Sequence, residues 1–478
     1  MKQTGDDYFD SEEFQKLLNT YEAAVNAGEP VFMDTEELVD IADYYQYTDR
    51  KDEAEEVISL ALSLSPGDSA PLTYRIHEAL SQGDTQKAWE WLEQIIDKDE
   101  PDYIYDRAEI LICEGRIEEA DEHLREIFRD LPPDEQQDFV VDVANIFTEY
   151  GQPERAMMWM AKVKHEDSTT FKELMARTLF GMGKYKDSQR LFNELIDTNP
   201  FSKSYWNALA SAQFMNEDYS EAIQSSEYAI AIDPEDPEGL IAKANGLYRL
   251  NNFEEALKFY RRYHEIVPDD ESALLYEGTC LINLQQTDEA ITVLLQALEL
   301  ASEGSPYLSD IYQELIFAYG EKKETDKALE LIEETENLDC DHVQLNLIRG
   351  HILLVANRLD EAKKSFHKAV EISDNPKQTL LRVIVSFYDN RYLKMAYNLF
   401  KKYLSHYENE ENGKNTEGYA YMALCCYDMR NYEEFLNYLQ KACEVNPKEC
   451  RLALGHLFSE EVKPEDYYQF IKDKLKLQ

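Results

Sequence analysis

Metal-ligating and nucleophilic side chains are the first candidates for chemistry in this chain. The tightest mixed cluster is Cys340, Asp341 and His342, three potential ligands in consecutive positions. Cys425 and Cys426 are adjacent, which suits neither a disulfide nor half of a zinc site, and no C-x-x-C pair occurs. The His residues show no H-E-x-x-H or similar ligand spacing. These patterns predict no metal ion and no cofactor.

Catalytic motifs are missing as well. The sequence contains no G-x-S-x-G motif, no Walker loop and no Rossmann glycine fingerprint. Carboxylate pairs occur throughout, but with 96 Asp+Glu against 48 Lys+Arg they are expected to form solvated helix faces. We therefore expect no enzymatic activity.

The charge restricts the possible partners. The chain has 478 residues and a formal net charge of −48, while 44% of its residues are hydrophobic, enough for a continuous core. A polyanion of this size repels phosphate backbones and anionic lipids. The composition predicts neutral or basic protein partners, and neither nucleic-acid nor membrane binding.

Cysteine usage and the chain's start indicate a compartment. The seven Cys are odd in number and scattered, which is typical of a reducing environment. No apolar run of the ~18 residues needed to span a bilayer occurs. If Met1 is the native start, the opening residues contain no apolar signal segment. These features predict a cytoplasmic protein.

An internal repeat organises the chain. An anchor position, usually occupied by Ala, recurs after a polar turn at intervals of 32 to 39 residues. Twelve residues before many of these anchors stands Ala or Gly, and four residues after most of them stands a large apolar residue; Gly350, Ala362 and Phe366 are one such set. The twelve anchors are Ala54, Ala88, Ala120, Ala156, Ser188, Ala222, Ala256, Ala290, Ala328, Ala362, Ala396 and Phe435.

The spacing has a physical reason. Within each half of a unit, apolar residues recur at three and four positions, as in an amphipathic helix. The small residue lets two helix axes approach, and the large one fills the gap beside it. Proline, for example Pro66 or Pro200, ends the second helix because it cannot continue it. A single hairpin cannot bury its faces alone, so we expect the hairpins to stack.

These units resemble the tetratricopeptide repeat (TPR) family. The best match to the family pattern consists of Trp206, Leu209, Ala210, Ala222, Ala229 and Pro234. The resemblance covers residues from ~35 to ~450 and implies an all-α fold, a right-handed α-solenoid (superhelix) of about twelve helix–turn–helix repeats. The opening segment also resembles uncharacterised TPR-repeat proteins of Bacteroidetes.

Three segments are predicted along the chain. Residues 1–34 are expected to form an N-terminal capping helix, residues 35–447 the tandem repeats, and residues 448–478 the C-terminal capping helices. Within the repeats, longer joints are expected near 299–309 and 406–418, the second being polar and rich in Asn.

By the resemblance, partners bind along the concave face, which the first helix of each repeat lines. In early repeats the corresponding positions are mostly acidic, and in late repeats they are mostly apolar. The partner-binding residues expected on this face are Asp40, Asp43, Asp106, Glu109, Asp142, Asn145, Leu347, His351, Leu381, Val385 and Leu424.

These faces predict a non-catalytic scaffold for protein segments. Residues 1–150 contain 40 acidic and 11 basic side chains, a net charge of −29, so this third should favour basic segments. Alternatively, this charge only keeps an exposed groove soluble and binds no partner. The apolar late face has three explanations: tightening of the superhelix, cover by a second copy in a homodimer, or docking of an apolar partner segment. A self-associating adaptor is therefore the alternative function.

Overall fold

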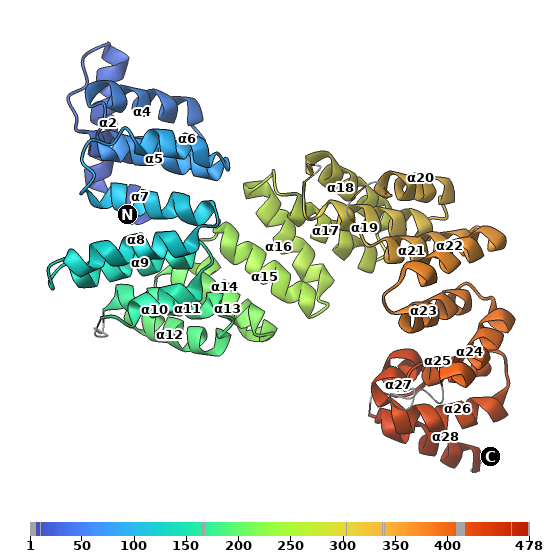
Figure 1. The fold of residues 1–478 in the computed structure, drawn as a ribbon. Helices are drawn as coiled ribbons and strands as arrows, with labels where there is room; N and C mark the ends of the chain where they lie inside the picture. Colours follow the sequence, from blue (N-terminus) through green and yellow to red (C-terminus); the bar gives the residue numbers. More distant parts are fainter. Residues whose placement is uncertain are drawn as a thin grey trace. The chain divides into compact units, whose positions relative to one another are not determined.

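The computed structural model describes residues 6–9, 11–163, 168–302, 304–336, 338, 340–407, 416–459 and 461–476, and all regular secondary structure in these ranges is helical. The chain divides into two compact units, Met1–Pro234 and Glu235–Gln478. We call them the first unit and the second unit and describe each by itself. Figure 1 shows the helices of each unit packed as successive hairpins.

Within the described residues, each unit contains six hairpins. Those of the first unit follow two N-terminal helices, and those of the second unit precede a C-terminal helical group. The helices of the first unit are α1 (Asp6–Phe9), α2 (Glu12–Ala27), α3 (Thr35–Tyr47), α4 (Lys51–Leu64), α5 (Ser69–Ser81), α6 (Thr85–Leu92), α7 (Pro101–Cys113), α8 (Ile117–Asp130), α9 (Gln136–Glu149), α10 (Pro153–Met160), α11 (Thr169–Gly181), α12 (Tyr185–Thr198), α13 (Lys203–Met215) and α14 (Tyr219–Ile232). The helices of the second unit are α15 (Pro237–Arg249), α16 (Phe253–Ile266), α17 (Glu271–Asn283), α18 (Thr287–Leu300), α19 (Leu308–Glu321), α20 (Thr325–Thr335), α21 (His342–Val355), α22 (Leu359–Ile372), α23 (Pro376–Asp389), α24 (Leu393–Tyr407), α25 (Tyr419–Asp428), α26 (Tyr432–Val445), α27 (Pro447–Leu454) and α28 (Tyr467–Lys476), with 3₁₀ turns η1 (Gly455–Leu457) and η2 (Pro464–Asp466).

The predicted register is confirmed. Each anchor lies in the second helix of its hairpin, and all twelve are buried, with at most 2% of their surface exposed. A Cβ built on Gly350, twelve residues before its anchor, would overlap the ring of Phe366, four residues after it. Gly278 and Leu294 stand in the same relation. The small residue therefore makes room for the large one at the helix crossing, and the fold is an α-solenoid of TPR-type hairpins.

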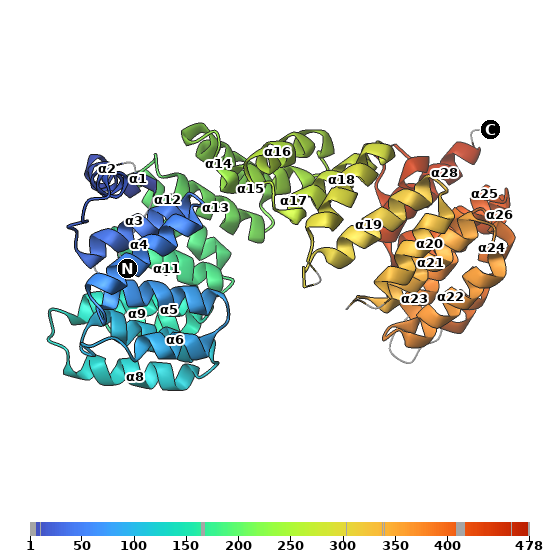
Figure 2. The same cartoon turned by 90° about the horizontal axis from the view of Figure 1, so that it is seen from above.

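First helices of neighbouring hairpins also contact each other. The contacts join α3 with α5 and α5 with α7 in the first unit, and α19 with α21 and α21 with α23 in the second. The row of α19, α21 and α23 can be followed in Figure 2. Each unit therefore presents a surface made of first helices, and the predicted partner-binding residues all belong to first helices.

The turn inside every hairpin has the same backbone geometry. Five residues before each anchor, the chain adopts a positive φ, and the next residue donates its N–H to the carbonyl five positions earlier, as Lys184 does to Leu179 at 2.9 Å. Four of these positions are Gly, namely Gly83, Gly115, Gly151 and Gly183. The other eight are Asp49, Glu217, Asn251, Gln285, Lys323, Asn357, Arg391 and Arg430.

Glycine at one of these turns is expected to stabilise its hairpin. A left-handed conformation costs a residue with a Cβ roughly 1–2 kcal/mol, while Gly adopts it readily and Asn tolerates it. Lys323→Gly should therefore raise the free energy of unfolding of the α19–α20 hairpin by about 1 kcal/mol. Hydrogen exchange of the α19 and α20 amides in the full chain measures this. Asn357→Gly is the control, because Asn already tolerates the left-handed conformation, and it should change the free energy of unfolding of its hairpin by less than half as much. Equal changes in the two variants would show that the backbone conformation is not the cause.

Helical segments flank the hairpins at both ends. The Ser11 hydroxyl accepts a hydrogen bond from the Phe14 N–H at 3.1 Å and begins α2, which buries Phe14, Leu18 and Tyr21. At the other end, α28 packs on α26, and Tyr467 stacks on Phe458. The three-segment division of the chain stays a prediction, and residues 408–415 of the predicted polar joint lie outside the described residues.

None of the described helices combines the length and the apolar character that crossing a bilayer requires.

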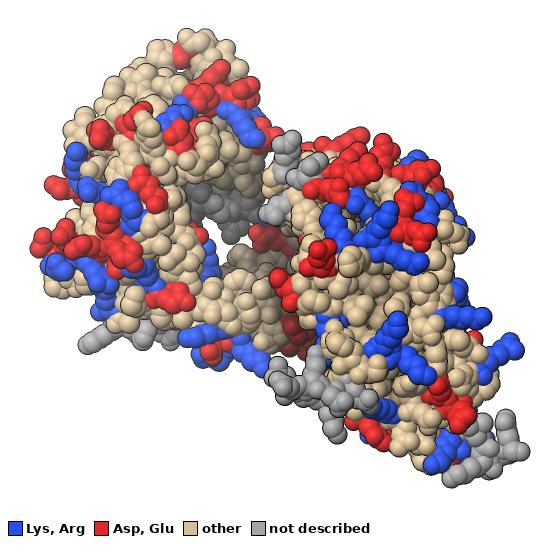
Figure 3. Space-filling view, turned by 45° about the vertical axis from the view of Figure 1, so that its right-hand side comes forward, with Lys and Arg blue, Asp and Glu red and all other residues tan. Residues whose placement is uncertain are grey.

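On the face in Figure 3, acidic and basic side chains are interspersed with uncharged surface.

Candidate functional site

A groove of about 700 Å³ lies on the first-helix surface of the second unit. It is formed by α21, α23, the start of α25 and α27, together with the residues that precede α25 and α27. Its lining residues are Gln344, Leu347, Ile348, His351, Gln378, Leu381, Arg382, Val385, Ser386, Asp389, Glu417, Tyr421, Asn446, Lys448, Glu449 and Leu452. Four of the five predicted late-face residues line it.

Apolar side chains form the floor and one side of this groove. Leu347 and Leu381 are mostly buried and join it to the core of the second unit. Ile348, Val385 and Tyr421 are half-buried, and Leu452 on α27 is 76% exposed. The remaining predicted residue, Leu424, is buried in the core and does not line the groove. Ile348, Val385, Tyr421 and Leu452, which we call the apolar strip, are thus all at least partly exposed among the lining residues of the groove.

Polar groups lie at the margin of the strip. The Asn390 amide donates to His351 Nδ1 at 3.2 Å, and the Ser386 hydroxyl lies 3.0 Å from the same nitrogen. Burial lowers the pKa of His351. The imidazole thus lies in a polar pair of contacts with Asn390 and Ser386 at this margin.

Glu449 fixes the end of the groove. Its buried carboxylate accepts the Gly418 N–H at 2.7 Å and the Ala420 N–H at 3.0 Å, both at the start of α25. Gly418 has a φ of 88°, and a Cβ there would lie 3.2 Å from Tyr403. Through these bonds α27 holds the first turn of α25, which carries Tyr421 into the groove.

The acidic face of the first unit differs from the prediction, because its carboxylates have partners within the unit. Asp40 accepts from the Tyr8 hydroxyl at 2.6 Å, and Asp142 from the Tyr105 hydroxyl at 3.0 Å. Asn145 donates to Glu149 at 2.9 Å. Burial, and then the charge of Asp40, raise the pKa of Asp43 to about 6.

Asp106 and Glu109 are not on an open wall. They are buried, with 2% and 5% of their surface exposed, and both lie beside His77. The distances from His77 Nε2 are 3.3 Å to Asp106 Oδ1 and 3.1 Å to Glu109 Oε2. Burial alone would lower the pKa of His77, but the two neighbouring carboxylates raise it to about 10.

The sequence did not predict this cluster, although a signal was available. His77 lies eleven residues before its anchor, as do Asp43, Glu109 and Asn145 before theirs. Comparing this position across neighbouring repeats places His77 beside Asp106 and Glu109, whereas a search for ligand spacing along the chain does not. In the sequence, the tightest mixed cluster was Cys340-Asp341-His342. There the Asp341 side chain accepts hydrogen bonds from the N–H groups of Val343 and Gln344 and caps α21.

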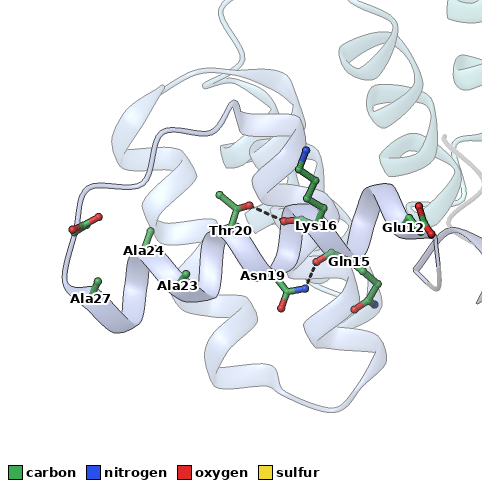
Figure 4. A pocket seen from close by; sticks show the side chains of 9 residues that line it. Glu12, Gln15, Lys16, Asn19, Thr20, Ala23, Ala24 and Ala27 are labelled. Carbon is green, nitrogen blue, oxygen red and sulfur yellow. Dashed lines mark hydrogen bonds between the residues drawn. The ribbon is translucent and has the colours of Figure 1, made fainter.

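A second, broad depression lies on the outer face of α2 and is shown in Figure 4. It is lined by Glu29 and by residues of one helix, several of which are alanines. Asn19 and Thr20 donate to carbonyls of their own helix, those of Gln15 and Lys16. This face has few groups directed at a ligand, and the groove in the second unit is the better candidate site.

Several known proteins are similar to this chain. The human protein O-mannosyl-transferase TMTC3 is 27% identical over 135 residues, which make up 26% of this chain and only 15% of that protein. Among solved structures, the APC/C hetero-tetramer Cut9-Hcn1 is 14% identical with a TM-score of 0.36, over 94% of both chains. YrrB, described as a TPR protein with an unusual peptide-binding site, is 19% identical with a TM-score of 0.34, over 40% of this chain and 93% of its own. The resemblance to Bacteroidetes proteins stays a prediction.

Two family models match parts of the chain. The model described as anaphase-promoting complex, cyclosome, subunit 3 matches residues 199–297, and a tetratricopeptide repeat model matches residues 417–449. These segments coincide with hairpins α13–α14 to α17–α18 and with hairpin α25–α26. Together with the twelve hairpins in register, they show that the chain contains tetratricopeptide-type repeats, which generally serve as scaffolds for protein–protein interaction.

Proposed function

We propose that the chain is a scaffold that binds a protein segment with apolar side chains in the groove of its second unit. The observation that carries this proposal is the apolar strip of Ile348, Val385, Tyr421 and Leu452, which faces water inside a cavity of about 700 Å³. Contiguous apolar surface of this kind is typical of interaction sites. The volume falls within the ~300–1,000 Å³ of known ligand pockets.

The polar margin supports a defined orientation of the segment. His351 contributes an imidazole, and Arg382, Lys448 and Asp389 contribute charged groups to the lining of the groove. Apolar side chains of the partner would enter the strip, while its backbone amides and polar side chains meet this margin. Such a combination gives affinity through burial and register through hydrogen bonds.

Leu452→Glu is expected to weaken binding of such segments at least about tenfold, because a carboxylate in the filled groove loses water without gaining a partner. The measurement starts from a displayed library of random peptides selected on the full chain. Affinities of the selected peptides for wild type and variants are then determined by fluorescence anisotropy. Val385→Glu, in the middle of the strip, should have a larger effect.

The matched control is Phe201→Glu, since Phe201 is 80% exposed, belongs to the first unit and is not one of the residues that line the groove. It should leave the affinities unchanged. Peptides without apolar residues, or equal binding to wild type and Leu452→Glu, would contradict the proposal.

Peptide selection and light scattering distinguish this proposal from two others, binding of basic segments and self-association. Selected peptides rich in Lys and Arg, with salt-sensitive binding that ignores Leu452→Glu, would support an acidic face in the first third that favours basic segments. The net charge of −29 over residues 1–150 supports that finer proposal. A dimeric mass by light scattering that Leu452→Glu makes monomeric would identify the occupant as a second copy.

A further inference from the structure

Outside the groove, one cluster in the first unit combines three metal-ligating side chains. His77 comes from α5, and Asp106 and Glu109 stand one turn apart on α7. One atom from each, His77 Nε2 and one oxygen of each carboxylate, lies within 4.8 Å of the other two. The sequence predicted no metal, and this cluster differs from Cys340-Asp341-His342.

The distances suit a shared cation. Zinc binds His nitrogen and carboxylate oxygen at ~2.0–2.1 Å in tetrahedral sites, which places neighbouring ligand atoms ~3.3 Å apart. His77 Nε2 lies 3.3 Å from Asp106 Oδ1 and 3.1 Å from Glu109 Oε2. Two edges of the expected tetrahedron are thus already present.

The state of His77 Nε2 is a second, independent observation. This nitrogen is buried and makes no aligned hydrogen bond, although it lies close to two carboxylate oxygens. A neutral imidazole nitrogen at this position would offer its lone pair to a metal ion.

The carboxylates are held in place by other side chains. The Thr73 hydroxyl donates to Asp106 Oδ2 at 2.6 Å, which leaves Oδ1 directed at His77. The Tyr150 hydroxyl donates to Glu109 Oε2 at 3.0 Å. Partners of this kind orient the ligands of metal sites and tune their affinity.

Charge favours a divalent ion as well. Asp106 and Glu109 are 2% and 5% exposed, so a carboxylate charge at this place needs a cation close by. A divalent ion supplies two positive charges at one point next to both carboxylates. Asp43, at the same repeat position on α3, adds negative potential at His77.

We propose that His77, Asp106 and Glu109 bind a divalent first-row transition-metal ion such as zinc. One imidazole nitrogen and two carboxylate oxygens are ligands that zinc accepts, and water would complete the coordination. The ion would join α5 to α7 and so tie the second hairpin of the first unit to the third.

The test uses the full chain and zinc chloride alone, under a reducing agent. After equilibrium dialysis, elemental analysis counts zinc per chain for wild type, His77→Gln and His367→Gln. His367 is exposed on α22 and serves as the control. We expect His77→Gln to hold one zinc fewer than wild type and His367→Gln to hold the same number. Equal zinc in wild type and His77→Gln would overturn the proposal and leave His77 as an ion-pair partner only.

Thr73→Val provides a variant that keeps all three ligands. Loss of its hydroxyl should weaken zinc binding about tenfold or more, as for other partners of metal ligands. Zinc should also raise the thermal midpoint of wild type and Thr73→Val, and leave that of His77→Gln unchanged. A midpoint that rises equally in His77→Gln would show that zinc acts elsewhere and would overturn the site.

Discussion

Glu449→Ala is expected to lower the local stability of α25 by about 3 kcal/mol. The substitution leaves the buried N–H groups of Gly418 and Ala420 without their acceptor, and each orphaned group costs roughly 1–3 kcal/mol. Because Tyr421 stands on the same first turn, the groove should lose affinity for its peptides together with this stability.

Native-state hydrogen exchange of the α25 amides in the full chain measures the effect. Glu444→Ala is the matched control, since Glu444 is an exposed residue of the neighbouring α26 and should change stability by less than about 0.5 kcal/mol. If α25 exchanges equally in both variants, the carboxylate of Glu449 does not hold the helix start.

Gly350→Val should destabilise the α21–α22 hairpin by about 3 kcal/mol, the upper end for overpacking a core. A Cβ at this position would lie 2.5 Å from Cδ1 and 2.7 Å from Cζ of the Phe366 ring. The two helices must then separate, or the ring must leave its place against Phe387, whose centroid lies 5.4 Å away.

A double-mutant cycle with Phe366→Leu tests the cause. The smaller side chain makes room for the new methyl groups, so the double variant should lose less stability than the two single losses together. Urea unfolding of the full chain, monitored by hydrogen exchange of the α21 and α22 amides, gives the free energy of unfolding of wild type, the two single variants and the double variant. Additive losses would mean that the clash is not with Phe366. Gly304→Ala, where a Cβ meets nothing within 4 Å, serves as the neutral control.

The hairpin register could be predicted because one helix crossing imposes the same pair of residue sizes in every repeat. Ser188 and Phe435 replace the usual Ala, yet both lie at the predicted positions and are buried. The positive-φ turn was also present in the sequence as Gly or Asn at half of the positions five residues before the anchors. The pattern is hard to recognise in the sequence because the other six positions carry charged residues or Gln.

The candidate sites were harder to predict, because neighbouring positions on one helix differ in what they face. Leu424 and Tyr421 are one turn apart on α25, but Leu424 enters the core and Tyr421 lines the groove. Likewise Asp106 and Glu109 read as an exposed acidic wall until the fold places His77 between them. Amino-acid type gives the polarity of a face, while its solvent exposure depends on the adjacent hairpin.

The twelve left-handed turn residues are all exposed, and they recur once per hairpin on the same edge of the stack. Their side chains take no part in the core, the groove or the His77 cluster. A cysteine or a non-natural amino acid introduced there could carry a fluorophore or a spin label without touching either candidate site. Within each unit, labels at these positions would stand one per hairpin. Distances measured between two such labels would then report changes in the curvature of that unit.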